Sequence, residues 1–255
     1  MFTLGGANVQ EKLFIARVCT LAGKIMLKSG AETSRVEDTM NRIASAFGIK
    51  NAQSFVTPTG INFSTGFADP SNTVRVNERS TDLHKIAEVN SISRKIDEGE
   101  LDALEAFRLL KAIEVAELAF PWYIQIIGAA ILSGCFTIMF GGTWPDFIPA
   151  VITGGVGFAI VLGAMEIVEM RLISDFFGSI GIGSLAFLFV ATGIGVELDK
   201  IIIGAVMPLV PGLHITNAVR DLIAGHLLSG LSKGSEAVLT AMAIGAGVAV
   251  VLAFL

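Results

Sequence analysis

The sequence predicts an α-helical integral membrane protein with about five transmembrane helices, preceded by a small α+β cytoplasmic domain. Of the 255 residues, 53% are hydrophobic and only 16% are charged, whereas soluble domains average about 25% charged residues. The charges are also unevenly placed, because 14 of the 18 Lys and Arg residues and 15 of the 23 acidic residues precede Phe120. We therefore expect a water-exposed domain over residues 1–119 and a transmembrane domain over residues 120–255.

The first half alternates between helical and strand-like patterns. Apolar residues recur at helical spacing in its first two segments, and Ser34 and Glu37 have the spacing of a helix capping box. Short β-branched and aromatic stretches follow, separated by turn sequences rich in Pro, Gly and Asn. The predicted order is two helices, three strands and two helices, at residues 9–29, 34–47, 55–57, 61–65, 74–76, 82–96 and 101–118.

The second half contains five apolar runs that predict membrane spans. Each run approaches or reaches the ~20 residues that a helix needs to cross ~30 Å of hydrocarbon. Trp122, Tyr123 and Trp144 lie where aromatic residues favour the membrane interface. The predicted spans are residues 122–140, 147–165, 176–196, 201–228 and 237–255.

Charge also predicts the orientation of the chain in the cell membrane. The basic residues of the first half favour the cytoplasmic side. Residues 1–10 lack the basic start of a signal peptide, so we expect this half to stay in the cytoplasm. An odd number of spans then places the C-terminus outside.

Several classes of function are disfavoured. The formal net charge is −5 and no basic stripe is present, which argues against nucleic acid as a partner. The two cysteines, Cys19 and Cys135, stand on opposite sides of the compositional break and do not form a ligand cluster, so we expect no metal. No phosphate-binding glycine loop or nucleophile elbow occurs, and we expect no cofactor.

The fourth apolar run is the strongest candidate for a binding site. Pro208, Pro211 and Gly212 interrupt it near the middle and free backbone groups from helical hydrogen bonds. In lipid such a break is tolerated inside protein or beside a wet cavity, and transporters use broken helices to bind substrate. The alternatives are a simple proline kink and two separate half-helices.

Polar residues follow this break. Asn217 and Asp221 share one helical face, and Arg220 lies beside them. Ionisable groups are costly inside a membrane, so we interpret Asp221 as a proton carrier and Arg220 as a holder of substrate carboxylate, with Asn217 binding a polar end. Alternatively, Arg220 and Asp221 mark the cytoplasmic end of a shifted helix. His214 is either a gate or a histidine satisfied by a freed carbonyl.

Three glutamates complete the candidate residues. Glu166 and Glu169, at the end of the second span, form either an acidic vestibule or a solvated loop. Glu32 lies between a predicted helix stop at Gly30 and a helix start at Ser34, and neither signal requires a carboxylate there.

Two segments resemble signatures of the threonine/serine exporter family. They are Ser29-Gly30-Ala31-Glu32-Thr33-Ser34-Arg35-Val36-Glu37, and residues 208–212 followed by residues 217–225. The resemblance covers nearly the whole chain. It implies gradient-driven export of small amino acids or dicarboxylates.

Fused members of this family carry about twice as many spans. This chain therefore resembles the larger half of a split transporter, which implies a second, smaller membrane subunit and allows a higher oligomer. The split form is also similar to a subfamily linked to succinate export, so the substrate stays open.

Two other readings remain beside an exporter subunit. In a membrane-anchored sensor or hydrolase acting through the N-terminal domain, Asp221→Asn would be silent and changes near Glu32 damaging. A channel would show flux that no gradient drives uphill.

Overall fold

The structure is a computed structural model that describes residues 9–67, 69–76, 80–116 and 120–254. It forms two compact units, the first made of Met1–Ala119 with Thr216–Lys233 and the second of Phe120–Ile215 with Gly234–Leu255. The predicted domain boundary at residue 119 stays a prediction. What the structure adds is that residues 216–233 pack with the N-terminal segment.

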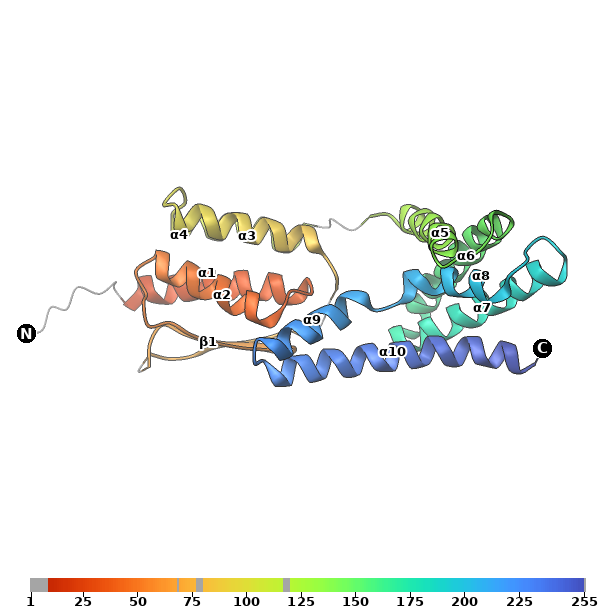
Figure 1. Ribbon diagram of the computed structural model, residues 1–255. Helices are drawn as coiled ribbons and strands as arrows, with labels where there is room; N and C mark the ends of the chain where they lie inside the picture. The colour runs from red at the N-terminus through yellow and green to blue at the C-terminus, as the bar shows by residue number, and fades with distance from the viewer. Residues whose placement is uncertain (1–8, 68, 77–79, 117–119, 255) are drawn as a thin grey trace, which may run out of the picture. The chain divides into compact units, whose positions relative to one another are not determined.

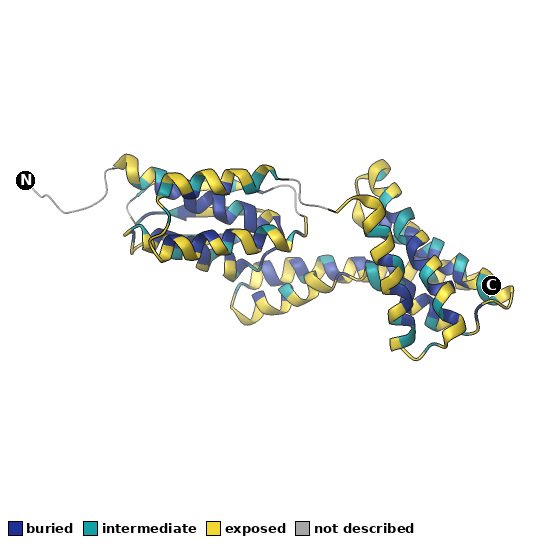
Figure 2. Ribbon diagram, turned by 90° about the horizontal axis from the view of Figure 1, so that it is seen from above, coloured by how far each residue is buried: buried dark blue, intermediate teal, exposed yellow. Residues whose placement is uncertain are grey.

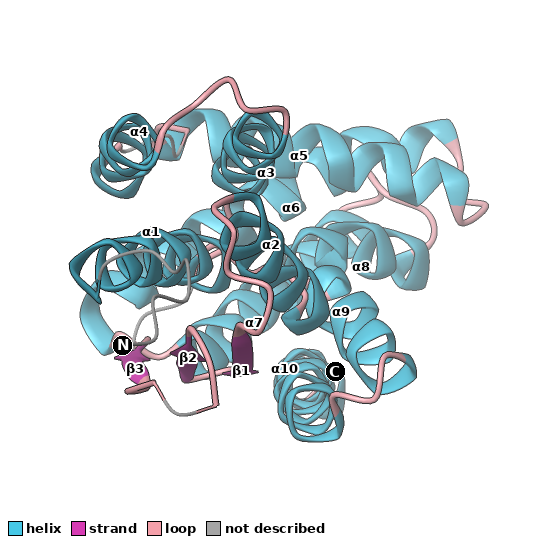
Figure 3. Ribbon diagram, turned by 90° about the vertical axis from the view of Figure 1, so that its left-hand side faces the viewer, coloured by secondary structure: helices cyan, strands magenta, loops and turns pink. Residues whose placement is uncertain are grey.

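The first unit is built in three layers (Figure 3). Two helices, α1 and α2, form the middle layer, with α3 and α4 on one side and a three-stranded antiparallel sheet of order β1-β2-β3 on the other. The elements are α1 (Val9–Lys28), α2 (Thr33–Ala46), β1 (Gln53–Thr57), β2 (Gly60–Ser64), β3 (Asn72–Arg75), α3 (Leu83–Asp97) and α4 (Ala103–Val115).

The core of this unit lies between its layers. α1 is covered on two sides, so Val18, Cys19 and Met26 are fully buried, and the sheet contributes Ile61 and Phe63. Each large apolar side chain buried in this way stabilises the fold by roughly 1.5–3 kcal/mol. The predicted four helices and three strands are all present, and Figure 1 labels the four helices and β1.

The turn between α1 and α2 differs from the predicted capping box. Gly30 has a φ of +86° and closes α1 in a Schellman motif, in which Ala31 N–H donates to the Met26 carbonyl at 3.0 Å. α2 then begins at Thr33, with Glu32 in the N-cap position, and the Glu32 side chain accepts no capping hydrogen bond from the helix. Glu37 accepts a hydrogen bond from Val56 N–H at 2.8 Å and so joins α2 to β1. The predicted capping box is wrong because the helix begins earlier and Glu37 bonds to the sheet.

The second unit holds most of the apolar helices. Four helices are long and apolar enough to cross a membrane, and a bent pair, Leu198–Leu209 with Gly212–Ile223, would be a fifth. The prediction of about five spans is confirmed to this extent. Along the chain the helices are α5 (Trp122–Met139), α6 (Trp144–Val168), α7 (Arg171–Ala191), α8 (Leu198–Val206), the short η1 (Met207–Leu209), α9 (Gly212–Ile223) and α10 (Leu227–Ala253).

Small residues let these helices approach closely, as is usual in membrane proteins. A Cβ atom built on Gly154 would collide with Ser133 of α5, and one built on Gly204 would collide with Thr137. Apolar side chains such as Ile127 and Ile131 are meanwhile 56% exposed. Figure 2 shows many exposed positions, in yellow, on these helices, which suits contact with lipid.

Candidate functional site

The two sequence motifs meet inside the first unit. Asn217 donates from Nδ2 to the Gly30 carbonyl at 2.9 Å. Arg220 forms a short ion pair with Glu32 through Nη1 and Oε1. Residues separated by nearly two hundred positions in the chain therefore form one polar contact, between the turn at 30–33 and helix α9.

Asp221 is the centre of this contact. Its side chain is fully buried, and its Oδ1 accepts a hydrogen bond from Thr33 N–H at 2.9 Å. Its Oδ2 accepts from the Thr33 hydroxyl at 3.1 Å and from the Lys233 ammonium at 2.8 Å. Lys233 also donates to the Ala31 carbonyl at 3.2 Å. We call Ala31, Thr33, Asp221 and Lys233 the docking cluster.

The docking cluster explains how α2 begins without a local cap. The first amides of a helix have no partner within the helix, and the helix dipole favours a negative charge there. Asp221 accepts the Thr33 amide from 188 positions away in the chain. The carboxylate therefore does for α2 what a neighbouring Ser, Thr or Asp usually does.

The docking cluster is also a buried ion pair. Lys233 and Asp221 are 6% and 0% exposed. Two such charges are stable in the interior only when they are paired and hydrogen-bonded, and removing one partner typically costs about 3–5 kcal/mol. This makes the contact between α9, α10 and the turn at 30–33 sensitive to the charge on Asp221.

A second, weaker contact lies beside it. His226 Nε2 is 3.8 Å from a carboxylate oxygen of Glu37. His226 follows Gly225, whose φ of +87° ends α9, and its amide donates to the Asp221 carbonyl at 2.8 Å. The turn after α9 is therefore held to α2 as well.

The predicted helix break is present. η1 ends at Leu209, and α9 begins at Gly212 with a bend of 62° between the two segments. Pro208 lies within η1, Pro211 directly precedes α9, and His214 is half-buried in the first turn of α9. The structure thus has two helical segments at this position rather than one kinked helix, and the roles predicted for these residues stay predictions.

The remaining acidic candidates lie at the junction of α6 and α7. Glu166 and Glu169 are exposed, and Glu169 adopts a left-handed φ of 54° at the end of α6. The predicted loop at 166–175 is shorter than expected, because α7 already begins at Arg171. Glu166 and Glu169 are therefore at the surface of the second unit.

Asp175 is a buried carboxylate in α7. It is 1% exposed, and among the described residues its Oδ2 has no hydrogen-bond partner. Arg171 Nε lies 3.6 Å from this oxygen, one helical turn earlier. A buried ionisable group in a membrane helix is costly and commonly functional.

Sequence reasoning missed Thr33, Lys233 and His226 as partners of the candidate residues. The sequence could have indicated a partner role for Lys233, because it is the one lysine within the long α10 segment 227–253. Thr33 and His226 carried no comparable signal, since their contacts depend on how distant segments pack. Within the described ranges no group of three His, Cys, Asp or Glu residues is arranged to hold a metal ion.

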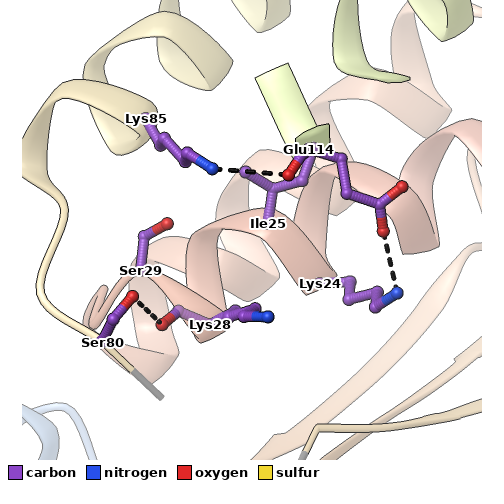
Figure 4. Close-up of a pocket in the computed structure, with 7 residues that line it drawn as sticks. All are labelled: Lys24, Ile25, Lys28, Ser29, Ser80, Lys85 and Glu114. Atoms are coloured by element: carbon purple, nitrogen blue, oxygen red, sulfur yellow. Dashed lines mark hydrogen bonds and ion pairs between the residues drawn. The ribbon is translucent and has the colours of Figure 1, made fainter. Parts of the chain in front are cut away.

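A separate pocket of about 110 Å³ lies between α1, α3 and α4 (Figure 4). Lys24 donates to the Glu114 carboxylate at 2.8 Å, and Lys85 donates to the Glu114 carbonyl at 3.4 Å. Burial by itself raises the pKa of Glu114, but the hydrogen bonds from Lys111 and Lys24 outweigh it and hold the pKa below its ordinary value. These lysines therefore serve to hold the end of α4 against α1 and α3.

Comparison with known proteins agrees with the sequence motifs. A family model described as a threonine/serine exporter (ThrE) matches residues 17–255. A protein of Mycobacterium tuberculosis named "Probable threonine/serine exporter" is 24% identical over 254 residues, covering 98% of this chain and 48% of the relative. The "Threonine/serine exporter" of Corynebacterium glutamicum is 24% identical over 250 residues, covering 92% of this chain and 50% of the relative.

A shorter relative matches end to end. The "Probable succinate transporter subunit YjjP" of Escherichia coli is 24% identical over 256 residues, covering 96% of each chain. This chain thus spans about half the length of the two exporters and nearly the whole length of the subunit. No solved structure matches the chain significantly. Because the family model covers residues 17–255, the chain belongs to the threonine/serine exporter family, a family of membrane transporters rather than enzymes.

Proposed function

We propose that the chain is the larger subunit of a two-subunit secondary exporter of threonine and serine or of a small dicarboxylate such as succinate. The lengths of the relatives support this, because the named exporters are twice as long and the named subunit is equally long. A second, smaller subunit of the same family supplies the remaining helices. The complex lies in the cell membrane, with the N-terminus in the cytoplasm and the C-terminus outside.

The observation that carries this proposal is the broken apolar segment at 198–223. Proline has no amide hydrogen, so Pro208 and Pro211 leave backbone groups beside the break without regular helical partners. Transporters bind the polar ends of substrates with such groups, shielded from lipid. In this proposal Gly212 and its neighbours bind the substrate beside the break.

The polar side chains after the break are bonded to the turn at 30–33 and are therefore not available to a substrate while α9 is held there. Asn217 is bonded to Gly30, and Arg220 is paired with Glu32. A planar guanidinium suits a carboxylate, so a substrate carboxylate competes with Glu32 for Arg220. Substrate binding is thereby linked to release of α9 from the turn.

The docking cluster is the proposed site of proton coupling. Protonation of Asp221 removes the charge that holds Lys233 and weakens the acceptor of the Thr33 amide. Asp175 is a second candidate proton carrier, because its buried Oδ2 has no hydrogen-bond partner among the described residues. An ion gradient would then drive α9 between a held and a released position.

The proposal is tested by efflux from cells loaded with threonine, serine or succinate. The chain is expressed alone, with its second subunit, and with both subunits plus an ionophore that collapses the gradient. We expect efflux that needs both subunits and stops when the gradient is collapsed. Efflux that persists unchanged without a gradient would indicate a channel, and absence of efflux for all three compounds would reject the exporter.

A further inference from the structure

An open pocket of about 430 Å³ lies between α2 and α3 in the first unit. These two helices pack side by side (Figure 3). The pocket is lined by polar and charged side chains, namely Glu32, Ser34, Arg35, Asp38, Arg42, Asn90 and Arg94. None of the docking cluster residues lines it.

Two lining residues belong to the first family motif and have no role in starting α2. Ser34 is not the helix cap, because Glu32 occupies the N-cap position and Asp221 accepts the first amide. Arg35 lies at the rim of the pocket, 3.7 Å from Glu32. The docking of α9 therefore accounts for Glu32 and Thr33, whereas Ser34 and Arg35 face this pocket.

The pocket has more positive than negative groups among the described residues. Arg42 is neutralised by Asp38, whose Oδ2 lies 2.5 Å from its Nη2. Glu32 is shared between Arg35 and Arg220, with the shorter contact to Arg220. Among the described residues of this pocket, Arg35 and Arg42 have carboxylate partners, whereas no ion pair joins Arg94 to a carboxylate.

This set of groups suits a small carboxylate. A guanidinium often binds a carboxylate through two parallel charge-assisted hydrogen bonds, which are stronger than hydrogen bonds between neutral groups. Asn90 and Ser34 offer amide and hydroxyl groups for a second polar end. The volume of about 430 Å³ lies within the range of small-molecule sites and is enough for a small amino acid or a four-carbon dicarboxylate.

We propose that the α2–α3 pocket binds a small organic carboxylate, with Arg94 and Arg35 as its anchors. A carboxylate at Arg35 draws this guanidinium away from Glu32 and leaves Glu32 to Arg220, so that occupancy strengthens the hold of the turn at 30–33 on α9. The pocket is thus a sensing site in the water-exposed unit. This goes beyond the proposed function, because binding here requires neither transport nor the second subunit.

The test is direct binding to the full purified chain in nanodiscs, without the second subunit. Radiolabelled succinate and threonine are the probes, and sodium sulfate and phosphate are the competitors. We expect saturable binding of at least one carboxylate that weakens roughly tenfold or more in Arg94→Gln, as for loss of one charge-assisted contact. Arg108→Gln, on the exposed side of α4, is the matched control and should bind as the wild type does.

A second variant and a second readout guard against a general loss of structure. Arg35→Lys keeps the charge but loses the fork, so it should bind several-fold more weakly while hydrogen exchange across α1 stays unchanged. Equal binding by wild type, Arg94→Gln and Arg108→Gln would overturn the proposal. The proposal would also be overturned if sulfate and phosphate displaced the radiolabelled carboxylate as well as the unlabelled carboxylate does, or if the wild-type chain bound neither probe.

Discussion

Removing either charge of the docking cluster should release the turn at 30–33 from α9. In Lys233→Met the Asp221 carboxylate stays buried without its ammonium partner. In Asp221→Leu the Lys233 ammonium stays buried without its carboxylate partner. Loss of one partner of a buried pair costs about 3–5 kcal/mol. Asp221→Leu also removes the acceptor of the Thr33 amide, which adds about 1 kcal/mol as for a lost helix cap.

The double variant is the sharper test. Replacing both charges by apolar groups is often neutral, because no unpaired charge stays buried. Asp221→Leu with Lys233→Met should therefore be more stable than either single variant, with a coupling energy of at least about 2 kcal/mol.

Hydrogen exchange at the Thr33 amide measures this contact directly, since that amide donates to Asp221. A loss of about 3 kcal/mol corresponds to roughly a hundredfold faster exchange. Lys95→Met, on the exposed face of α3, is the control and should leave the rate unchanged. Additive effects of the two single substitutions, or exchange at Thr33 unchanged in both, would refute the assignment of a coupled, buried pair.

Three further outcomes follow from other parts of the structure. The folded-state pKa of Glu114 is held below its ordinary value of 4.5, so the stability that its carboxylate contributes is present above that pH and is lost as the pH falls below it. The melting-temperature difference between wild type and Glu114→Gln should therefore shrink below pH 4.5. A constant difference would contradict the ion-pair assignment. Gly204→Leu should prevent close approach of α8 to α5 and lower the yield of folded protein in the membrane, whereas Gly163→Leu, which meets no neighbouring atom within 4 Å, should not. Asp175→Asn should leave substrate exchange intact but abolish uphill efflux if this buried carboxylate carries the proton; equal uphill efflux would exclude that role.

Much of the fold follows from local patterns in the sequence. The apolar runs, the three strands and the break near Pro211 could be predicted because each depends on neighbouring residues. The start of α7 at Arg171 could not be placed correctly, because Arg171 and Asp175 interrupt the apolar pattern and the predicted third span begins only at residue 176. One turn apart on a helix, they lie 3.6 Å from each other and can stay within it.

The candidate site was predicted only in part. Asn217, Arg220 and Asp221 were selected because polar groups are rare in apolar segments. Their partners in the turn at 30–33 could not be deduced, because contacts over 188 positions depend on tertiary packing. The same packing explains why the local capping rule failed at Ser34.

In the proposed mechanism the charge on Asp221 links an ion gradient to movement of substrate. Uphill efflux of threonine and succinate from proteoliposomes that hold this chain and the proposed second subunit tests this link, with wild type and Asp221→Asn measured side by side. We expect gradient-driven efflux of at least one compound by the wild type and its loss in Asp221→Asn, with both proteins equally abundant in the membrane. Undiminished uphill efflux in Asp221→Asn would contradict it.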